Sequence, residues 1–180
     1  MKEYFVALVC SLMFAPVAFA RVADAAPERL ALEYKATVKL PPAKAYHALT
    51  DVAHWWSGDH TYSGSADNLT LDARAGGCWC EKLADGGSVL HMSVLMAMPG
   101  KMLRLGGGLG PLQSAAVNGV MTWTIKPAGS GSEIAMSYLV AGSMSGGLDK
   151  VAAGVDQVLT EQFERLQRLI ATGSAAAPKK

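Results

Sequence analysis

Residues 148–170, LDKVAAGVDQVLTEQFERLQRLI, form the most regular pattern in the chain, with apolar residues returning every three or four positions. This spacing places them on one side of a helix and puts charged residues such as Glu161 and Arg168 on the other. The apolar stripe consists of Leu148, Val151, Ala152, Val155, Val158, Leu159, Phe163, Leu166, Leu169 and Ile170. A helix of this kind must bury its stripe, so the chain must supply a large apolar surface elsewhere.

The sequence before this helix alternates apolar and polar residues in short runs, which is typical of half-buried strands. Residues 31–40 form the first such run, and residues 42–50 then show the spacing of a short helix. Further strands are expected at residues 69–73, 77–83, 89–98, 102–105, 119–126 and 133–140, separated by glycine turns. The predicted order is one strand, one or two short helices, six strands and the long helix, with an antiparallel sheet curling around that helix.

Several stretches resemble one known family. They are ALTDVAHWWS at residues 48–57, GGCWCE at 76–81, PGKMLRL at 99–105 and the final long helix. Together they are similar to the START-like (SRPBCC) superfamily over residues 29–171, and to its branch of heat-shock ATPase activator homologues and polyketide cyclase-like proteins. The resemblance implies an α+β helix-grip fold, in which a seven-stranded antiparallel sheet curls around the C-terminal helix. It also implies a cavity between sheet and helix, which in relatives takes lipids, polyketides or hormones.

The N-terminus has the pattern of a bacterial export signal. Residues 1–20 hold one lysine, an apolar run and the small residues Ala18 and Ala20 before the expected cleavage point. Cleavage near Ala25 is the fallback, and a retained N-terminal anchor is the alternative. We therefore expect a periplasmic or secreted protein without stable membrane insertion after signal removal. The START-like domain spans residues 29–171, residues 172–180 form a flexible tail, and a net charge of +1 gives no reason to expect nucleic acid.

Two cysteines flank a tryptophan at residues 78–80, and His91 follows a short hairpin away. If the turn lies at residues 85–86, Cys80 faces His91, and Cys78 shares that outer face, while Trp79 and Glu81 face the core. Side chains two apart on a regular strand are about 6.5 to 7 Å apart, too far for a disulfide without a bulge. We therefore expect free thiols. Packing of half-buried cysteines is favoured, and a zinc or copper(I) site formed by Cys78, Cys80 and His91 is the alternative.

Aromatic residues with polar tips are concentrated in residues 51–64, which in the resembling fold lie at one mouth of the cavity. The glycine-rich residues 106–111 lack a phosphate-binding motif and are predicted to form a mobile cavity rim. The alternation of residues along the strands adds further side chains that should face the cavity. Tyr138 is expected to donate a hydrogen bond to one of the two carboxylates there, Glu81 or Asp156. The predicted ligand cavity comprises Trp55, Trp56, His60, Tyr62, Trp79, Glu81, Trp123, Tyr138 and Asp156.

Two classes of function fit these patterns. The first is an exported protein that binds a small apolar or amphipathic molecule without a cofactor. The second is an enzyme, either cyclase-like or metal-dependent. Binding is favoured because the polar residues expected inside form no recognisable nucleophile and base pair. A chaperone ATPase activator-like role is a further alternative, which the export signal weakens. Fold similarity alone does not separate these readings.

Overall fold

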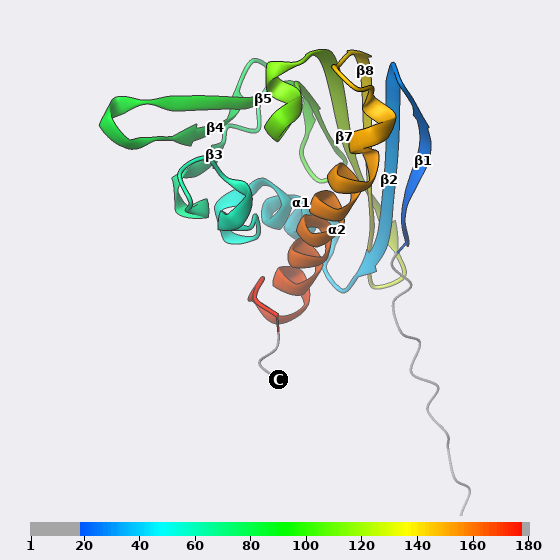
Figure 1. The fold of residues 1–180 in the computed structure, drawn as a ribbon. Coiled ribbons are helices and arrows are strands. Elements are labelled where there is room, and N and C mark those ends of the chain that lie inside the picture. Colours follow the sequence, from blue (N-terminus) through cyan, green and yellow to red (C-terminus); the bar gives the residue numbers. More distant parts are fainter. Residues whose placement is uncertain (1–18, 178–180) are drawn as a thin grey trace, which may run out of the picture.

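The computed structural model of the protein describes residues 19–177, with side chains described from residue 21. An antiparallel sheet curls around a long C-terminal helix without closing into a barrel (Figure 1). The strands are β1 (Phe19–Ala26), β2 (Arg29–Val38), β3 (Leu69–Leu71), β4 (Cys78–Lys82), β5 (Ser88–Met98), β6 (Met102–Gly106), β7 (Ala116–Ala128) and β8 (Gly131–Ser143). The helices are α1 (Pro42–Thr50), α2 (Leu148–Thr172) and five short 3-10 turns, η1 (Val52–His54), η2 (Gly58–His60), η3 (Ala66–Asn68), η4 (Ala84–Gly86) and η5 (Gly110–Ser114). The predicted helix-grip fold is confirmed.

The sheet has the order β1-β2-β8-β7-β6-β5-β4-β3, with every neighbouring pair antiparallel. Seven of these strands match the expected ones, and β1 is an additional strand at the edge. It pairs with the free side of β2, from Phe19 opposite Lys35 to Ala26 opposite Arg29. The prediction missed β1 because alanine and charged residues dominate it, so it lacks the alternation that marks a buried strand.

The α2 stripe packs on the concave face of the sheet, as predicted. The Trp123 ring of β7 stacks on Phe163 of α2, with ring centroids 5.8 Å apart, and the Tyr34 ring of β2 lies 5.7 Å from that phenylalanine. The strand positions that parity assigned to the interior are all buried, namely Trp79, Glu81, Met121, Trp123, Ile125, Ile134, Met136 and Tyr138. Strand alternation and helix periodicity therefore identified the same core from two directions.

The β4–β5 hairpin projects beyond the rest of the sheet (Figure 1). Its turn is wider than the expected two-residue turn, because the backbone N–H of Leu83 donates to the carbonyl of Gly87 at 2.9 Å and encloses η4. Asp85 and Gly86 both have positive φ there, at 54° and 78°. Aspartate and glycine are the residues that tolerate this conformation most readily, which explains why the turn forms at this point.

The structure leaves the predicted export signal untested and describes part of the predicted tail. The predicted export signal lies outside the described residues except for Phe19 and Ala20, which begin β1. At the other end, α2 continues to Thr172, and residues 173–177 turn back on the helix. Arg168 donates to the carbonyl of Ala175 at 3.2 Å, and Ala175 is buried. This part of the predicted flexible tail is therefore packed rather than loose.

Within residues 19–177, no helix is both long enough and apolar enough to cross a membrane.

Candidate functional site

A pocket of about 660 Å³ lies between the first half of α2, the segment around η5, and the loop that contains η2. Most of its wall is aliphatic or aromatic, and within residues 19–177 no Asp or Glu side chain lines it. The lining residues are Trp56, His60, Thr61, Tyr62, His91, Leu109, Gly110, Pro111, Leu112, Met144, Lys150, Val151, Gly154, Val155, Val158 and Leu159. Its volume and composition are those of a site for a small, mainly apolar molecule.

The α2 side of the pocket is formed by the N-terminal part of the helical stripe. Val151, Val155 and Val158 are only partly buried, although the stripe predicted them to be in the core. Gly154 lies among them, and a Cβ atom built on it would meet no atom within 4 Å. Further along the stripe, Phe163 and Leu166 are buried in the core, whereas the three valines border the pocket. One helix therefore contributes both to the core and to the pocket wall.

Two adjacent tryptophans separate the core from the pocket. Trp55 is 1% exposed and donates its indole N–H to the carbonyl of Leu49 at 3.0 Å. Trp56 lines the pocket, and its indole N–H donates to the carbonyl of His60 at 2.9 Å. Behind Trp56 stands Trp79, whose ring meets it edge-on at a centroid distance of 4.7 Å. The pocket wall is thus backed by an aromatic layer that resists collapse.

Residues 51–64, which contain η2 and border the opening of the pocket, form the mouth loop. Side chains of α2 hold this loop in place. The Arg165 guanidinium donates to the carbonyl of Trp55 at 2.8 Å, and the Gln162 side-chain oxygen accepts from the backbone N–H of Ser57 at 2.8 Å. Gln162 is 1% exposed, so its bond to the loop forms away from water. Buried hydrogen bonds of this kind are costly to break, which fixes the loop against the helix.

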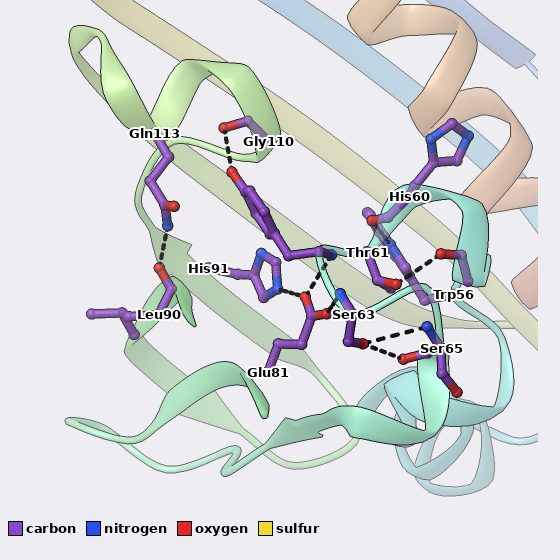
Figure 2. A network of polar contacts seen from close by, with 12 residues as sticks. Trp56, His60, Thr61, Ser63, Ser65, Glu81, Leu90, His91, Gly110 and Gln113 are labelled. Carbon is purple, nitrogen blue, oxygen red and sulfur yellow. Dashed lines mark hydrogen bonds and ion pairs between the residues drawn. The ribbon is translucent and has the colours of Figure 1, made fainter. Parts of the chain in front are cut away.

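Glu81 joins the same loop to the β4–β5 hairpin. Its carboxylate is 1% exposed and accepts hydrogen bonds from the backbone N–H groups of Tyr62 and Ser63 and from the His91 ring (Figure 2). Burial alone would raise the pKa of Glu81, but the hydrogen bonds from Ser63, Tyr62 and His91 outweigh it and hold that pKa below its ordinary value. The ionised carboxylate is therefore the stable form at neutral pH, and it fastens the mouth loop.

His91 reaches the pocket because β5 contains a bulge. Trp79 pairs with Met92 as predicted, but Cys80 pairs with Leu90, so His91 is an extra residue. A bulge re-aims the side chain at its position. His91 and Met92 are 7% and 1% exposed, while Leu90 is 54% exposed. The prediction that His91 lies opposite Cys80 on the outer face is therefore wrong, and His91 instead binds Glu81 on the inner face.

The cysteines also differ from the prediction. Cys78 and Cys80 form a disulfide, with their Cα atoms 5.5 Å apart. The expectation of free thiols assumed a regular strand, in which residues two apart are about 6.5 to 7 Å apart, but β4 is contracted at this point and brings the two Cα atoms to 5.5 Å. The two sulfur atoms are bonded to each other, and His91 binds the Glu81 carboxylate. In the disulfide form, these three residues therefore offer no zinc or copper site. Among the residues that the structure describes, no group of three His, Cys, Asp or Glu side chains could hold a metal ion.

The other predicted cavity residues divide into lining and supporting positions. Trp56, His60 and Tyr62 line the pocket. Glu81 lies behind the pocket wall, where its carboxylate binds the His91 ring and the backbone N–H of Tyr62. Three predicted tryptophans, at positions 55, 79 and 123, belong to the core and do not line it. The sequence missed His91, Met144 and Lys150 as lining residues, although it placed part of the rim correctly in the glycine-rich residues 106–111.

Tyr138 and Asp156 take different partners from those predicted. The Tyr138 hydroxyl donates to the carbonyl of Gly107 at 3.2 Å and accepts from the backbone N–H of Leu109 at 3.1 Å, so it holds the pocket rim instead of a carboxylate. Burial raises the pKa of Tyr138 to about 12. Asp156 accepts from the Tyr34 hydroxyl at 2.6 Å and does not line the pocket. Burial and that bond to Asp156 raise the pKa of Tyr34.

Comparisons with solved structures show the same fold in several proteins. A conserved protein of unknown function from Enterococcus faecalis, EF2215, is 17% identical with a TM-score of 0.58, covering 91% of this chain and 81% of that chain. CalU16 from Micromonospora echinospora is 14% identical with a TM-score of 0.56, covering 91% and 86%. The Aha1 dimer from Colwellia psychrerythraea is 14% identical with a TM-score of 0.57, covering 79% and 97%. At these identities the likeness concerns the fold.

The family is shown by the sequence itself. No curated protein matches the chain. A family model described as polyketide cyclase / dehydrase and lipid transport matches residues 29–171, which include β2 to β8 and nearly all of α2. That range contains every residue lining the pocket. The chain therefore belongs to the polyketide cyclase / dehydrase and lipid transport family, in the START-like superfamily.

Proposed function

We propose that the protein is an exported binder of a small apolar or amphipathic molecule, held in the pocket between α2, the η5 segment and the mouth loop. The observation that carries this proposal is the exposed apolar wall of that pocket. Val151, Val155 and Val158 are left partly uncovered at the pocket, in a helix whose stripe residues Leu159, Phe163 and Leu166 are buried. Leaving apolar side chains uncovered forfeits about 25 cal/mol for each Å² of surface, which a ligand recovers on binding.

The contacts around the pocket support a preformed site. Glu81 of β4 and Gln162 and Arg165 of α2 hold the mouth loop from two elements, and Tyr138 holds the rim. Each of these bonds exists before any ligand arrives, so binding does not have to order the loop. Pre-organisation of this kind improves affinity by removing an entropic cost.

Recovery of the native ligand tests the proposal. Protein is expressed with its own N-terminus, isolated from the periplasm and examined by native mass spectrometry, followed by organic extraction. We expect a bound molecule at a stoichiometry of one. The matched control is Val155→Asp, which places a charge in the apolar wall and should lose the molecule. A parent protein that stays empty in extracts and also fails to bind neutral apolar dyes would contradict the proposal.

A cyclase-like enzyme is the second candidate, and one observation favours it. His91 presents an imidazole at the pocket wall with a carboxylate behind it, 2.8 Å away, an arrangement that can move protons. An enzyme and a binder differ in what a His91→Gln variant retains. If the variant holds a molecule that differs chemically from the one in the parent, the protein converts its ligand. If both hold the same molecule, it is a binder.

A further inference from the structure

His91 is the buried polar side chain in the pocket wall that has an unused hydrogen-bonding atom. Its Nε2 atom is bonded to Glu81 at 2.8 Å, and within residues 19–177 Nδ1 has no partner. Neighbouring atoms do not cover Nδ1 completely, so another molecule can reach it. Since His91 is 7% exposed and lines the pocket, that access is to the pocket interior.

The other polar tips around the pocket are already engaged. The Thr61 hydroxyl donates to Gly58 at 2.7 Å, and the Tyr62 hydroxyl donates to Gly110 at 3.3 Å. His60 lies 3.1 Å from Glu161, and Lys150 lies 3.1 Å from Asp149. Among the described side chains that line the pocket, the buried polar atom left for a ligand is therefore Nδ1 of His91.

The partner of His91 determines which ring nitrogen carries hydrogen. Glu81 already accepts from two backbone N–H groups and can only accept from the ring as well, so Nε2 must be the donor. In the neutral ring, Nδ1 then presents a lone pair to the pocket. In the charged ring it presents an N–H. The neutral ring can accept a hydrogen bond from an acid, and the charged ring can donate one to the anion of that acid.

The charges around the pocket favour an acid over other protic groups. In the part of the chain that the structure describes, the ionisable nitrogen groups in the wall are His60, His91 and Lys150, and no carboxylate lines it. Their acidic partners, such as Glu81 and Glu161, lie outside the lining. A negative charge that enters the pocket therefore meets basic groups first, and a buried amine or other cation would have no lining carboxylate to bind.

We propose that the ligand is an apolar molecule with one acidic head group, a carboxylic acid or an acidic phenol, and that His91 Nδ1 receives the head. The O–H of the acid donates to Nδ1. When the proton moves onto Nδ1, the resulting N–H donates to the anion, so no other reactant is needed. Glu81 acts as a positioning residue that fixes the ring and its tautomer. The apolar body lies along Val151, Val155 and Val158. This inference rests on the proposed binding function.

Competition with a neutral dye tests the inference without knowledge of the natural ligand. Nile red serves as the neutral probe of the pocket, and dodecanoic acid, methyl dodecanoate and 1-dodecanol are added as competitors. These competitors share one apolar body and differ in the head. We expect the acid to displace the dye at concentrations about tenfold lower than the ester or the alcohol, as a charge-assisted hydrogen bond implies. His91→Leu should remove that difference. His47→Leu, an exposed histidine of α1 outside the pocket, should keep it.

A spectroscopic measurement on the unmodified protein covers the case in which His91→Leu fails to fold. Nitrogen-15 spectra of the histidine rings should show the His91 Nδ1 signal shifting with dodecanoic acid and staying in place with the ester. A purely structural His91 would leave both signals unchanged.

The outcomes separate the two proposals. Equal displacement by acid and ester overturns the acidic head and leaves the binding function standing. Displacement by the alcohol as strong as by the acid also overturns it. A protein that binds neither the dye nor any competitor refutes both.

Discussion

The hydroxyl of Tyr62 donates to the carbonyl oxygen of Gly110 at 3.3 Å, and this bond joins the mouth loop to the η5 segment across the opening of the pocket. Tyr62 is 55% exposed, so the bond lies at the surface, where water competes for both partners. It is therefore the contact around the pocket that opens most easily.

Tyr62→Phe should accelerate exchange of a bound molecule and leave stability nearly unchanged. The substitution removes the hydroxyl and keeps the ring that packs 5.9 Å from His91. Stopped-flow release of Nile red measures the rate, and we expect an increase of a few-fold with a change in unfolding free energy below about 0.5 kcal/mol. Tyr62→Ala, which also removes the ring, should be faster still. Identical release rates in the parent and both variants would show that ligands leave by another route.

Glu81→Gln should destabilise the fold and flatten its response to acid. The pKa of Glu81 is depressed in the folded state, so the ionised carboxylate contributes stability above the unfolded-state pKa of about 4.3. That contribution is lost as pH falls through the lower folded-state pKa. Urea unfolding at neutral pH should show a loss of about 1 to 3 kcal/mol in the variant, and the gap should narrow at acidic pH. A gap of constant size would contradict the assignment.

The Cys78–Cys80 disulfide should be present in protein isolated without reductant. Trypsin cleavage releases residues 75–82 with both cysteines in one peptide, which should resist alkylation before reduction and take two alkyl groups afterwards. Replacing both cysteines with serine should lower stability by about 1 to 2 kcal/mol, the value expected for a very short closed loop. Alkylation of the unreduced peptide would restore the free-thiol prediction.

Export with cleavage after Ala20 is a further proposal, and the strand pairing supports that position over the fallback. Removal of residues 1–20 leaves most of β1 in place, whereas cleavage near Ala25 removes nearly all of it and uncovers the edge of β2. An uncovered edge invites pairing with other chains. N-terminal sequencing of periplasmic protein should therefore read Arg21 first. Met1 on the recovered protein would reject export by a cleaved signal.

The core was predictable because it depends on repeating patterns. Met121, Trp123 and Ile125 alternate along one strand, and Phe163 and Leu166 recur along one helix, so their burial follows from spacing alone. The site depends on single departures from those patterns. His91 reaches the pocket through one extra residue in β5, and a bulge leaves no periodic trace in the sequence.

Partners far apart in sequence were the other unpredictable part. Tyr34 and Asp156 are 122 positions apart, and their bond depends on how α2 sits across β2. The prediction assigned the donor role to Tyr138 because it faced inward, but Tyr34 is buried as well and meets the same criterion. The choice among them is made by the three-dimensional position of the rim, where Tyr138 meets Gly107 and Leu109. Parity can assign a face, but not a neighbour.

At Gly154, adding a side chain should raise the stability of α2 and reduce the space for a ligand. Its backbone is ordinary helix and nothing lies near its missing side chain, so Gly154→Ala should stabilise α2 by up to about 1 kcal/mol. The same methyl group would occupy space inside the pocket, and Gly154→Leu would fill far more of it. Thermal unfolding and dye capacity should move in opposite directions along this series. Glycine at this position therefore lowers the stability of α2, the longest helix described, and leaves room in the pocket for a larger ligand.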